Sequence, residues 1–181
     1  MALDYGAKVH QATDGVFHGA AFFEQATHQI KAILSAQTFA AIDRPSFLAH
    51  IMFELALDRQ LMFLNPNLAA EFYDNLSQTK DKTICKYLAD NNIQENHIQN
   101  FLLFLREFNK HKYLHSYTDN SQIAFALCRI YQRATQKNVM TDRDRVAHVI
   151  TEVDAYLAPL VPEILEHTIT VLRQNMSQDK I

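Results

Sequence analysis

The sequence predicts an all-α protein: a single-domain bundle of about seven to nine helices around one central apolar helix at residues 45–64. Composition supplies two of the three observations behind this prediction. Of the 181 residues, 48% are hydrophobic, enough for a substantial core, whereas only 3 are glycine and 4 are proline. Chains with so few helix-breaking residues form long helices and few tight turns. The third observation is the 45–64 segment itself, which is apolar on almost every side, as a buried helix should be.

Short polar breaks divide the chain into periodic segments. The expected helices cover residues 2–14, 20–35, 45–64, 66–77, 83–91, 95–116 and 121–136. Gly15 and Gly19 are expected to interrupt the first helical region. Asn65 and Pro66 can end the central helix and begin the next one, because Asn caps helices and Pro is tolerated in a first turn.

The last long segment opens at Thr141, a candidate N-cap followed by acidic residues that suit the helix dipole. Pro159 and Pro162 are expected to split this segment, because each removes a backbone donor and clashes with the preceding turn. The chain has no internal repeat and no linker long enough to divide it. Residues 1–175 are therefore expected to form one domain, with 176–181 as a frayed tail.

Charge and hydropathy argue against several classes of function. The net charge of −3 and the lack of a Lys/Arg run give no support for binding nucleic acid or an anionic membrane. No segment offers the roughly 18 uncharged apolar residues of a membrane span, and no signal peptide is expected. Cys85 and Cys128 lack metal-type spacing, which predicts free thiols and a cytoplasmic protein.

The central segment carries three polar residues at i, i+4 and i+8: His50, Glu54 and Asp58. On a helix they fall within about 80° of one another. Burying such groups is costly unless they are paired or bind a metal. The stripe therefore predicts either a metal site, a set of ion pairs, or the solvated face of an amphipathic helix.

A second ladder with the same spacing lies near the start of the chain, at His10, Asp14 and His18. Two helices that each present imidazole and carboxylate groups could face one another. These donors suit Mn, Fe, Zn or Mg, and helical bundles build dinuclear sites from inward-pointing ligands at such spacings. The six residues of the two ladders are the candidate metal ligands.

A third candidate is the pair His111 and His115, which has the His-x3-His spacing of a metal pair on a helix. The polar residues around the pair indicate an exposed turn and favour surface histidines. Together with His50, however, the pair defines an alternative three-histidine metal site, in a helical bundle similar to the DinB family.

Two short motifs resemble the acyl carrier protein phosphodiesterase family. The segment GAKVHQATDGVFHGAAFFEQA is similar to the family's Gly-Ile-x-x-His-x-x-x-Asp-x-x-Thr-Asp motif, with His10 and Asp14 matching. The segment FLAHIMFELALDRQL is similar to a second motif, in which two acids four residues apart correspond to Glu54 and Asp58. A divergent branch with His-x3-Glu-x3-Asp fits better still, and the resemblance covers about residues 5–135.

The resemblance implies an all-helical, HD-domain-like fold that removes the 4′-phosphopantetheine arm from acyl carrier protein with a divalent metal, typically manganese. The metal ligands that it implies are His10, Asp14, Glu54 and Asp58, with His18 and His50 as additions. The chain departs from the family pattern at Phe17-His18, where Thr-Asp is usual, and it contains neither Asn-Phe-Leu-Ala-His nor Gly-Asn-x-x-x-Asp. One acidic ligand is therefore expected to be replaced, by His18 or another group.

Two functions follow as hypotheses. The first is a metal-dependent phosphodiesterase whose partner is acyl carrier protein or a small phosphodiester. The second is a helical binding or oligomerising module that keeps the fold without the chemistry, with its polar stripe paired to nearby side chains.

Overall fold

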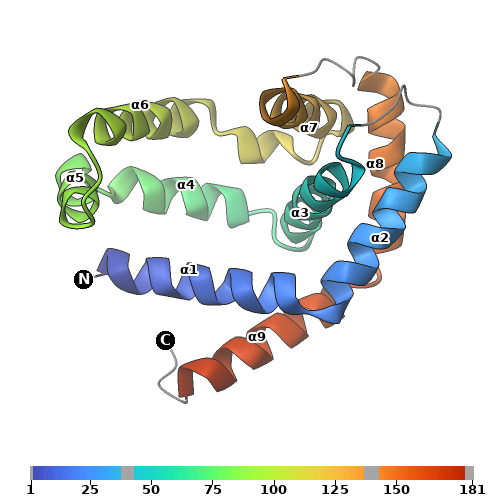
Figure 1. The fold of residues 1–181 in the computed structure, drawn as a ribbon, viewed down its shortest axis with the longest axis horizontal. Coiled ribbons are helices and arrows are strands. Elements are labelled where there is room, and N and C mark those ends of the chain that lie inside the picture. The colour runs from blue at the N-terminus through green and yellow to red at the C-terminus, as the bar shows by residue number, and fades with distance from the viewer. Residues whose placement is uncertain (1, 38–42, 137–142, 178–181) are drawn as a thin grey trace.

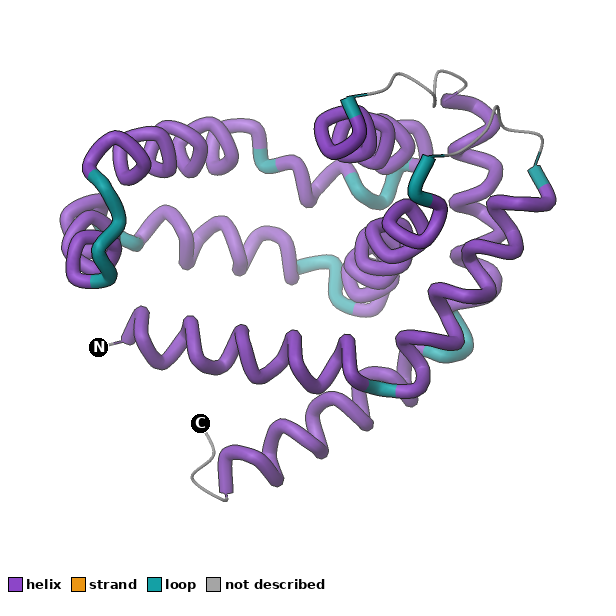
Figure 2. The backbone as a smooth tube through the Cα atoms, viewed as in Figure 1, coloured by secondary structure: helices purple, strands orange, loops and turns teal. Residues whose placement is uncertain are grey.

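Helices account for nearly all of the chain that can be described. The computed structural model describes residues 2–37, 43–136 and 143–177. Their helices are, in order, α1 (Ala2–Gly19), α2 (Ala21–Ala36), α3 (Pro45–Leu64), α4 (Leu68–Gln78), α5 (Asp81–Asp90), α6 (Glu95–His111), the 3-10 helix η1 (Tyr113–Ser116), α7 (Asn120–Thr135), α8 (Arg143–Leu157) and α9 (Val161–Ser177). These ranges contain no strand, and short loops join most of the helices (Figure 2). The predicted all-α bundle is confirmed.

Helix α3 lies at the centre of the main body, which consists of α1, α2, α3, α7, α8 and α9. It packs against α2 and α8, while α7 packs along α8 and also contacts α3 (Figure 1). Helices α1 and α9 pack against each other along one edge, on the side where both chain ends lie. Helices α4, α5 and α6 extend away from α3, and we call them the arm.

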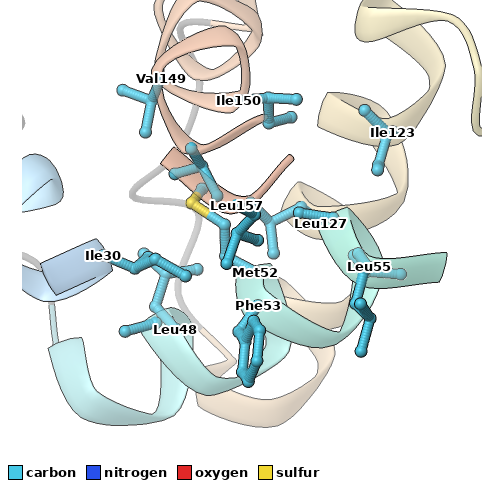
Figure 3. Packing of buried hydrophobic residues seen from close by; sticks show 14 of the residues in the cluster. Ile30, Leu48, Met52, Phe53, Leu55, Ile123, Leu127, Val149, Ile150 and Leu157 are labelled. Atoms are coloured by element: carbon cyan, nitrogen blue, oxygen red, sulfur yellow. The ribbon is translucent and has the colours of Figure 1, made fainter. Parts of the chain in front are cut away.

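The core of the main body is built on α3, because apolar residues cover most of that helix. Figure 3 shows Met52 and Leu157 meeting near the centre, with Ile30 on one side and Ile123 and Leu127 on the other. All of these side chains are at most 1% exposed. Full burial of one such side chain contributes about 1.5–3 kcal/mol, so this cluster dominates the stability of the fold.

The arm has a much smaller buried cluster, formed by Ile84, Ile98 and Leu102. Large apolar side chains of α6 remain exposed nearby: Leu103 and Phe104 are 57% and 56% accessible. The arm therefore gains less from the burial of apolar surface than the main body does.

Two helix boundaries differ from the predictions by more than one turn, and the helix predicted to begin at Pro66 begins at Leu68. The predicted interruption at Gly15 is wrong, because α1 continues to Gly19. A single glycine costs a helix about 1 kcal/mol, which is too little to end one that packs on neighbours. The predicted helix at 95–116 ends at His111, because Lys112 adopts the left-handed conformation with φ of 48°. That geometry closes the α-helix, and η1 follows.

The last predicted segment is split where its prolines lie. Helix α8 ends at Leu157 and α9 begins at Val161, so Pro159 falls in the connection and Pro162 in the first turn of α9. Both places tolerate the missing backbone donor. The predicted N-cap Thr141 and most of the predicted tail, residues 178–181, lie outside the described residues.

Two further observations bear on the sequence predictions. Both Cys85 and Cys128 are free thiols, as predicted. Within the described ranges, none of the helices combines the length and the apolarity that a membrane crossing requires.

Candidate metal centre

The bend between α1 and α2 brings the end of α1 against the middle of α3. Helix α1 stops at Gly19, and Ala20 has an extended backbone with φ −80° and ψ 147°. Helix α2 then packs along α3, so the last turn of α1 lies over the same face of α3. His18, in that last turn, therefore meets Glu54, which lies 36 positions further along the chain.

Aromatic side chains fix this junction. The Phe17 ring stacks on Phe53 of α3 with centroids 5.4 Å apart. The Phe23 ring presents an edge contact to both His18 and His50, at 4.7 Å and 4.9 Å. These ring contacts restrict the rotamers that the two imidazoles can adopt.

Three potential metal ligands converge at this junction. The Nε2 atoms of His18 and His50 each lie 3.0 Å from Oε1 of Glu54. One donor atom from each of the three side chains lies within 4.8 Å of the other two. Their side chains are 34%, 40% and 41% exposed, so small molecules can reach them. We call this arrangement the His18/His50/Glu54 cluster.

The geometry of the cluster fits a divalent metal. Nitrogen and oxygen ligands lie about 2.0–2.2 Å from zinc, which separates neighbouring ligands in a tetrahedral site by about 3.4 Å. The two 3.0 Å contacts to Glu54 therefore need only a small adjustment to admit an ion. Two histidines and one glutamate are a ligand set of catalytic zinc enzymes, in which the fourth position stays open for water or substrate.

The structure brings together three of the six predicted ligands. His10 and Asp14 pair with each other on α1 at 3.6 Å, with side chains 76% and 52% exposed. They do not join the His18/His50/Glu54 cluster, the one group of three or more close donors found among the described residues. A role for His10 and Asp14 in binding metal stays a prediction.

Asp58, the sixth predicted ligand, lies one turn beyond Glu54 and also outside the cluster. It lines a separate cavity with apolar side chains. Desolvation of its carboxyl, together with the negative charge of Glu54, raises the pKa of Asp58 to about 6, although the residue as a whole is exposed. Burial and the charge of Asp58 in turn raise the pKa of Tyr117 to about 12.

The alternative three-histidine site is not assembled. His111 hydrogen-bonds Glu107 at 3.2 Å and stacks on Tyr113. His115 lies in η1 and stacks on Tyr73, with centroids 5.6 Å apart. Helix α6 ends at His111 and His115 lies in η1, so the two histidines do not share one helix face. Among the described residues, neither of them lies in a three-donor group with His50.

A cavity of about 310 Å³ adjoins His50, between α2 and the start of α3. Its polar lining includes Glu24, His28, Lys31 and Ser46, and Lys31 Nζ donates to Ser46 Oγ at 3.4 Å. The sequence pattern does not single out these residues as part of a site. A signal was present for Ser46, because Pro45 marks a first turn whose free backbone N–H groups favour anions.

No protein-family model, curated protein or solved structure matches the chain. The resemblance to acyl carrier protein phosphodiesterases therefore stays a prediction from two motifs.

Proposed function

We propose that the protein is a divalent-metal-dependent hydrolase that acts on a phosphodiester. The observation that carries this proposal is the convergence of His18, His50 and Glu54 from two helices on one point. The ligand set suits Zn, Mn or Fe, with Mg the least suited of the predicted ions because it prefers oxygen ligands.

Each side chain of the cluster has a definable task. His18 and His50 would supply neutral nitrogen ligands, and Glu54 would supply the one negative charge. Such an ion supplies two kinds of chemistry: it acidifies a bound water and polarises a phosphoryl oxygen. The partial exposure of all three side chains leaves room for water and substrate on the open side.

The cavity beside His50 supports an anionic substrate. Lys31 and the Ser46 hydroxyl offer donors to a phosphate group, and both belong to the wall that adjoins His50. A volume of about 310 Å³ is at the small end of ligand pockets, which span about 300–1,000 Å³. Glu24 on the same wall opposes a highly charged substrate, so a diester with one charge fits better than a monoester.

The substrate follows from the resemblance alone. It favours the 4′-phosphopantetheine diester of acyl carrier protein, with that protein as the partner. A small phosphodiester is the alternative that the cavity would accept without a protein partner.

Metal binding is the first test. Isothermal titration with Zn²⁺ and with Mn²⁺ should give about one ion per chain. Glu54→Gln and His18→Gln should each weaken binding by more than about 100-fold, because even the loss of an outer-shell partner costs 10–100-fold. His148→Gln is the matched control, an exposed histidine of α8 outside the cluster, and should bind metal like the wild type. The absence of a saturable site, or equal weakening by His148→Gln, would contradict the proposed centre.

Hydrolysis is the second test, with bis(4-nitrophenyl) phosphate as the probe. Activity should require added metal and should be lost in Glu54→Gln. Lys31→Met should raise KM about tenfold with a smaller change in kcat, because Lys31 contributes to substrate binding rather than to the reaction. Metal binding without metal-dependent hydrolysis of this probe or of holo acyl carrier protein would reject the enzymatic function.

A second candidate function is a non-catalytic helical binding protein. It is favoured by the hydrogen bonds that Glu54 Oε1 accepts from His18 and His50 at 3.0 Å, because the bond from His18 joins α1 to α3 without an ion. The exposed apolar side chains of the arm would then form part of a binding surface. On this hypothesis Glu54→Gln lowers stability equally with and without a chelator, and added metal has no effect on the melting temperature.

A further inference from the structure

A second cavity, of about 400 Å³, opens where the arm joins the main body. Its walls come from α3, α4, α6 and η1. The apolar side chains that line it are Met62, Leu68, Ala69, Phe72, Phe108 and Leu114. Asp58 of α3 completes the lining and is its single charged residue.

Asp58 differs from the carboxylates around it in having no partner. Glu54 is bonded to two histidines, and Asp154 is paired with Arg59 at 3.1 Å. Within the described residues, Asp58 makes neither a hydrogen bond nor an ion pair. Asp58 is exposed, so water hydrates part of its carboxylate, but the apolar neighbours in the cavity still raise the cost of the charge unless a cation or a donor satisfies it. At neutral pH Asp58 is mainly ionised, since its pKa is about 6.

The aromatic side chains of the lining are a second reason to expect that the ligand of this cavity carries a positive charge. The Phe72 and Phe108 rings lie 6.1 Å apart at an interplanar angle of 85°. Phe72 remains 44% exposed, so a ligand can reach it. The faces of aromatic rings attract cations, most strongly where water is partly excluded. Aromatic and aliphatic side chains also bury the apolar body of a ligand.

The wall formed by η1 is held in place by a buried tyrosine. Tyr73 is 1% exposed, and its hydroxyl accepts a hydrogen bond from the backbone N–H of Leu114 at 3.0 Å. This bond ties η1 to α4, so the cavity is present before a ligand arrives. A preformed pocket reduces the ordering cost of binding.

Other classes of ligand fit this lining less well. An anion would be repelled by the negative charge of Asp58. A metal ion would find one carboxylate, because Asp58 is not part of the three-donor cluster. A hydrocarbon would displace water from the exposed Asp58 carboxylate and leave the charge unpaired. A volume of about 400 Å³ suits a small molecule.

We propose that the cavity at Asp58 binds a small organic cation, a primary amine on an aromatic or aliphatic body. The ammonium group pairs with the Asp58 carboxylate, and the body packs against Phe72, Phe108 and Leu114. This site is independent of the proposed metal chemistry, because none of its lining residues belongs to the His18/His50/Glu54 cluster.

The test uses 2-phenylethylamine as the probe, with 2-phenylethanol and 3-phenylpropionate as matched neutral and anionic probes. Binding to the whole chain is followed by NMR at neutral pH with a chelator present. The amine should bind at least about tenfold more tightly than either matched probe, as expected when a charged hydrogen bond is gained. The amides of Phe108 and Leu114 should shift on binding.

Asp58→Asn should weaken the binding of the amine by about tenfold and leave the binding of 2-phenylethanol unchanged. Asp14→Asn is the matched control, because it removes an exposed carboxylate of α1 and should leave amine binding unchanged. Phe72→Ala should weaken the binding of all three probes. Equal affinity for the three probes, unchanged amine binding in Asp58→Asn, or no saturable binding of the amine would each overturn the proposal.

Discussion

The main body and the arm bury their apolar side chains to different degrees. In the main body, α3 is surrounded by α2, α7 and α8, and one continuous buried cluster joins the four helices and the start of α9. In the arm, the separate buried cluster has three members, Ile84, Ile98 and Leu102. The helices around α3 therefore supply most of the stability of the fold, and the arm depends on its attachment to them.

The difference follows from how many neighbours each helix has. Helix α3 is apolar on nearly all sides because helices cover nearly all sides. Helix α6 is amphipathic, but Phe101, Leu103 and Phe104 on it remain 41–57% exposed. Apolar groups that stay in water contribute little to folding. The two candidate sites reflect this division, since the metal centre lies within the main body and the amine cavity lies at its border with the arm.

The largest effect is expected for a core truncation in the main body. Leu127→Ala should lower the free energy of unfolding by about 4 kcal/mol, because the side chain is 1% exposed and its removal leaves a cavity. Urea denaturation followed by circular dichroism would measure it. A loss below about 1 kcal/mol would mean that this core is less closely packed than the structure indicates.

A slightly smaller loss is expected for the ion pair between α3 and α8. Arg59 is 7% exposed, and its Nη1 has no hydrogen-bond partner. Asp154→Asn would leave this buried charge uncompensated and should cost about 3 kcal/mol. The control is Asp90→Asn in the arm, which breaks the exposed Lys86 pair and should cost less than about 0.5 kcal/mol. Equal losses of stability in the two variants would show that the buried ion pair of the main body contributes no more than the exposed pair of the arm.

A truncation in the arm should act locally. Leu102→Ala should cost about 2 kcal/mol, which corresponds to about 30-fold faster amide exchange by local opening. Hydrogen exchange resolved along the chain should show this acceleration in α5 and α6, with α3 and α8 much less affected. Uniform acceleration in all helices would instead show that arm and main body unfold as one unit.

The smallest expected effect is an increase in stability, caused by removing the charge of Asp58. The pKa of Asp58 is raised from 3.8 to about 6, so the folded state disfavours the ionised carboxylate. The contribution of this group to stability is therefore complete below about pH 4 and is lost as the pH rises through 6. The shift corresponds to about 3 kcal/mol at most, and solvent exposure reduces the expected effect to about 1 kcal/mol.

Asp58→Asn should therefore stabilise the metal-free protein by about 1 kcal/mol at pH 7 and by almost nothing at pH 4. Denaturation curves at both pH values, with a chelator present, would measure the difference. A destabilised variant at pH 7 would show that Asp58 has a partner that stabilises its charge.

Much of the fold could be predicted because its strongest signals are local. The central helix was expected at residues 45–64, and it spans Pro45–Leu64. Its apolar composition, the proline at its start and the Asn65-Pro66 pair after it all act within a few residues. The end of α6 was missed because Lys112 is an ordinary residue in a left-handed conformation that composition does not reveal.

The metal centre could be predicted only in part, because spacing shows which residues share a face but not what that face meets. His50 and Glu54 were expected to act together, and they do lie together. Their third partner depended on where the first helix ends. With a break at Gly15, His18 would have left the ladder, whereas the continuous α1 brings it to Glu54. Asp58 is rotated further around α3 and faces the second cavity instead.

The His18–Glu54 contact also bears on how the protein would take up an ion. The contact closes a span of 36 positions. Closing a loop of that size from an unfolded chain costs about 4 kcal/mol in entropy. Here the packing of α2 on α3 closes it first, so assembling the ligands requires only the ordering of side chains. Metal uptake would then be separate from chain folding, unlike a zinc finger, and the metal-free protein would keep its helices in a chelating buffer.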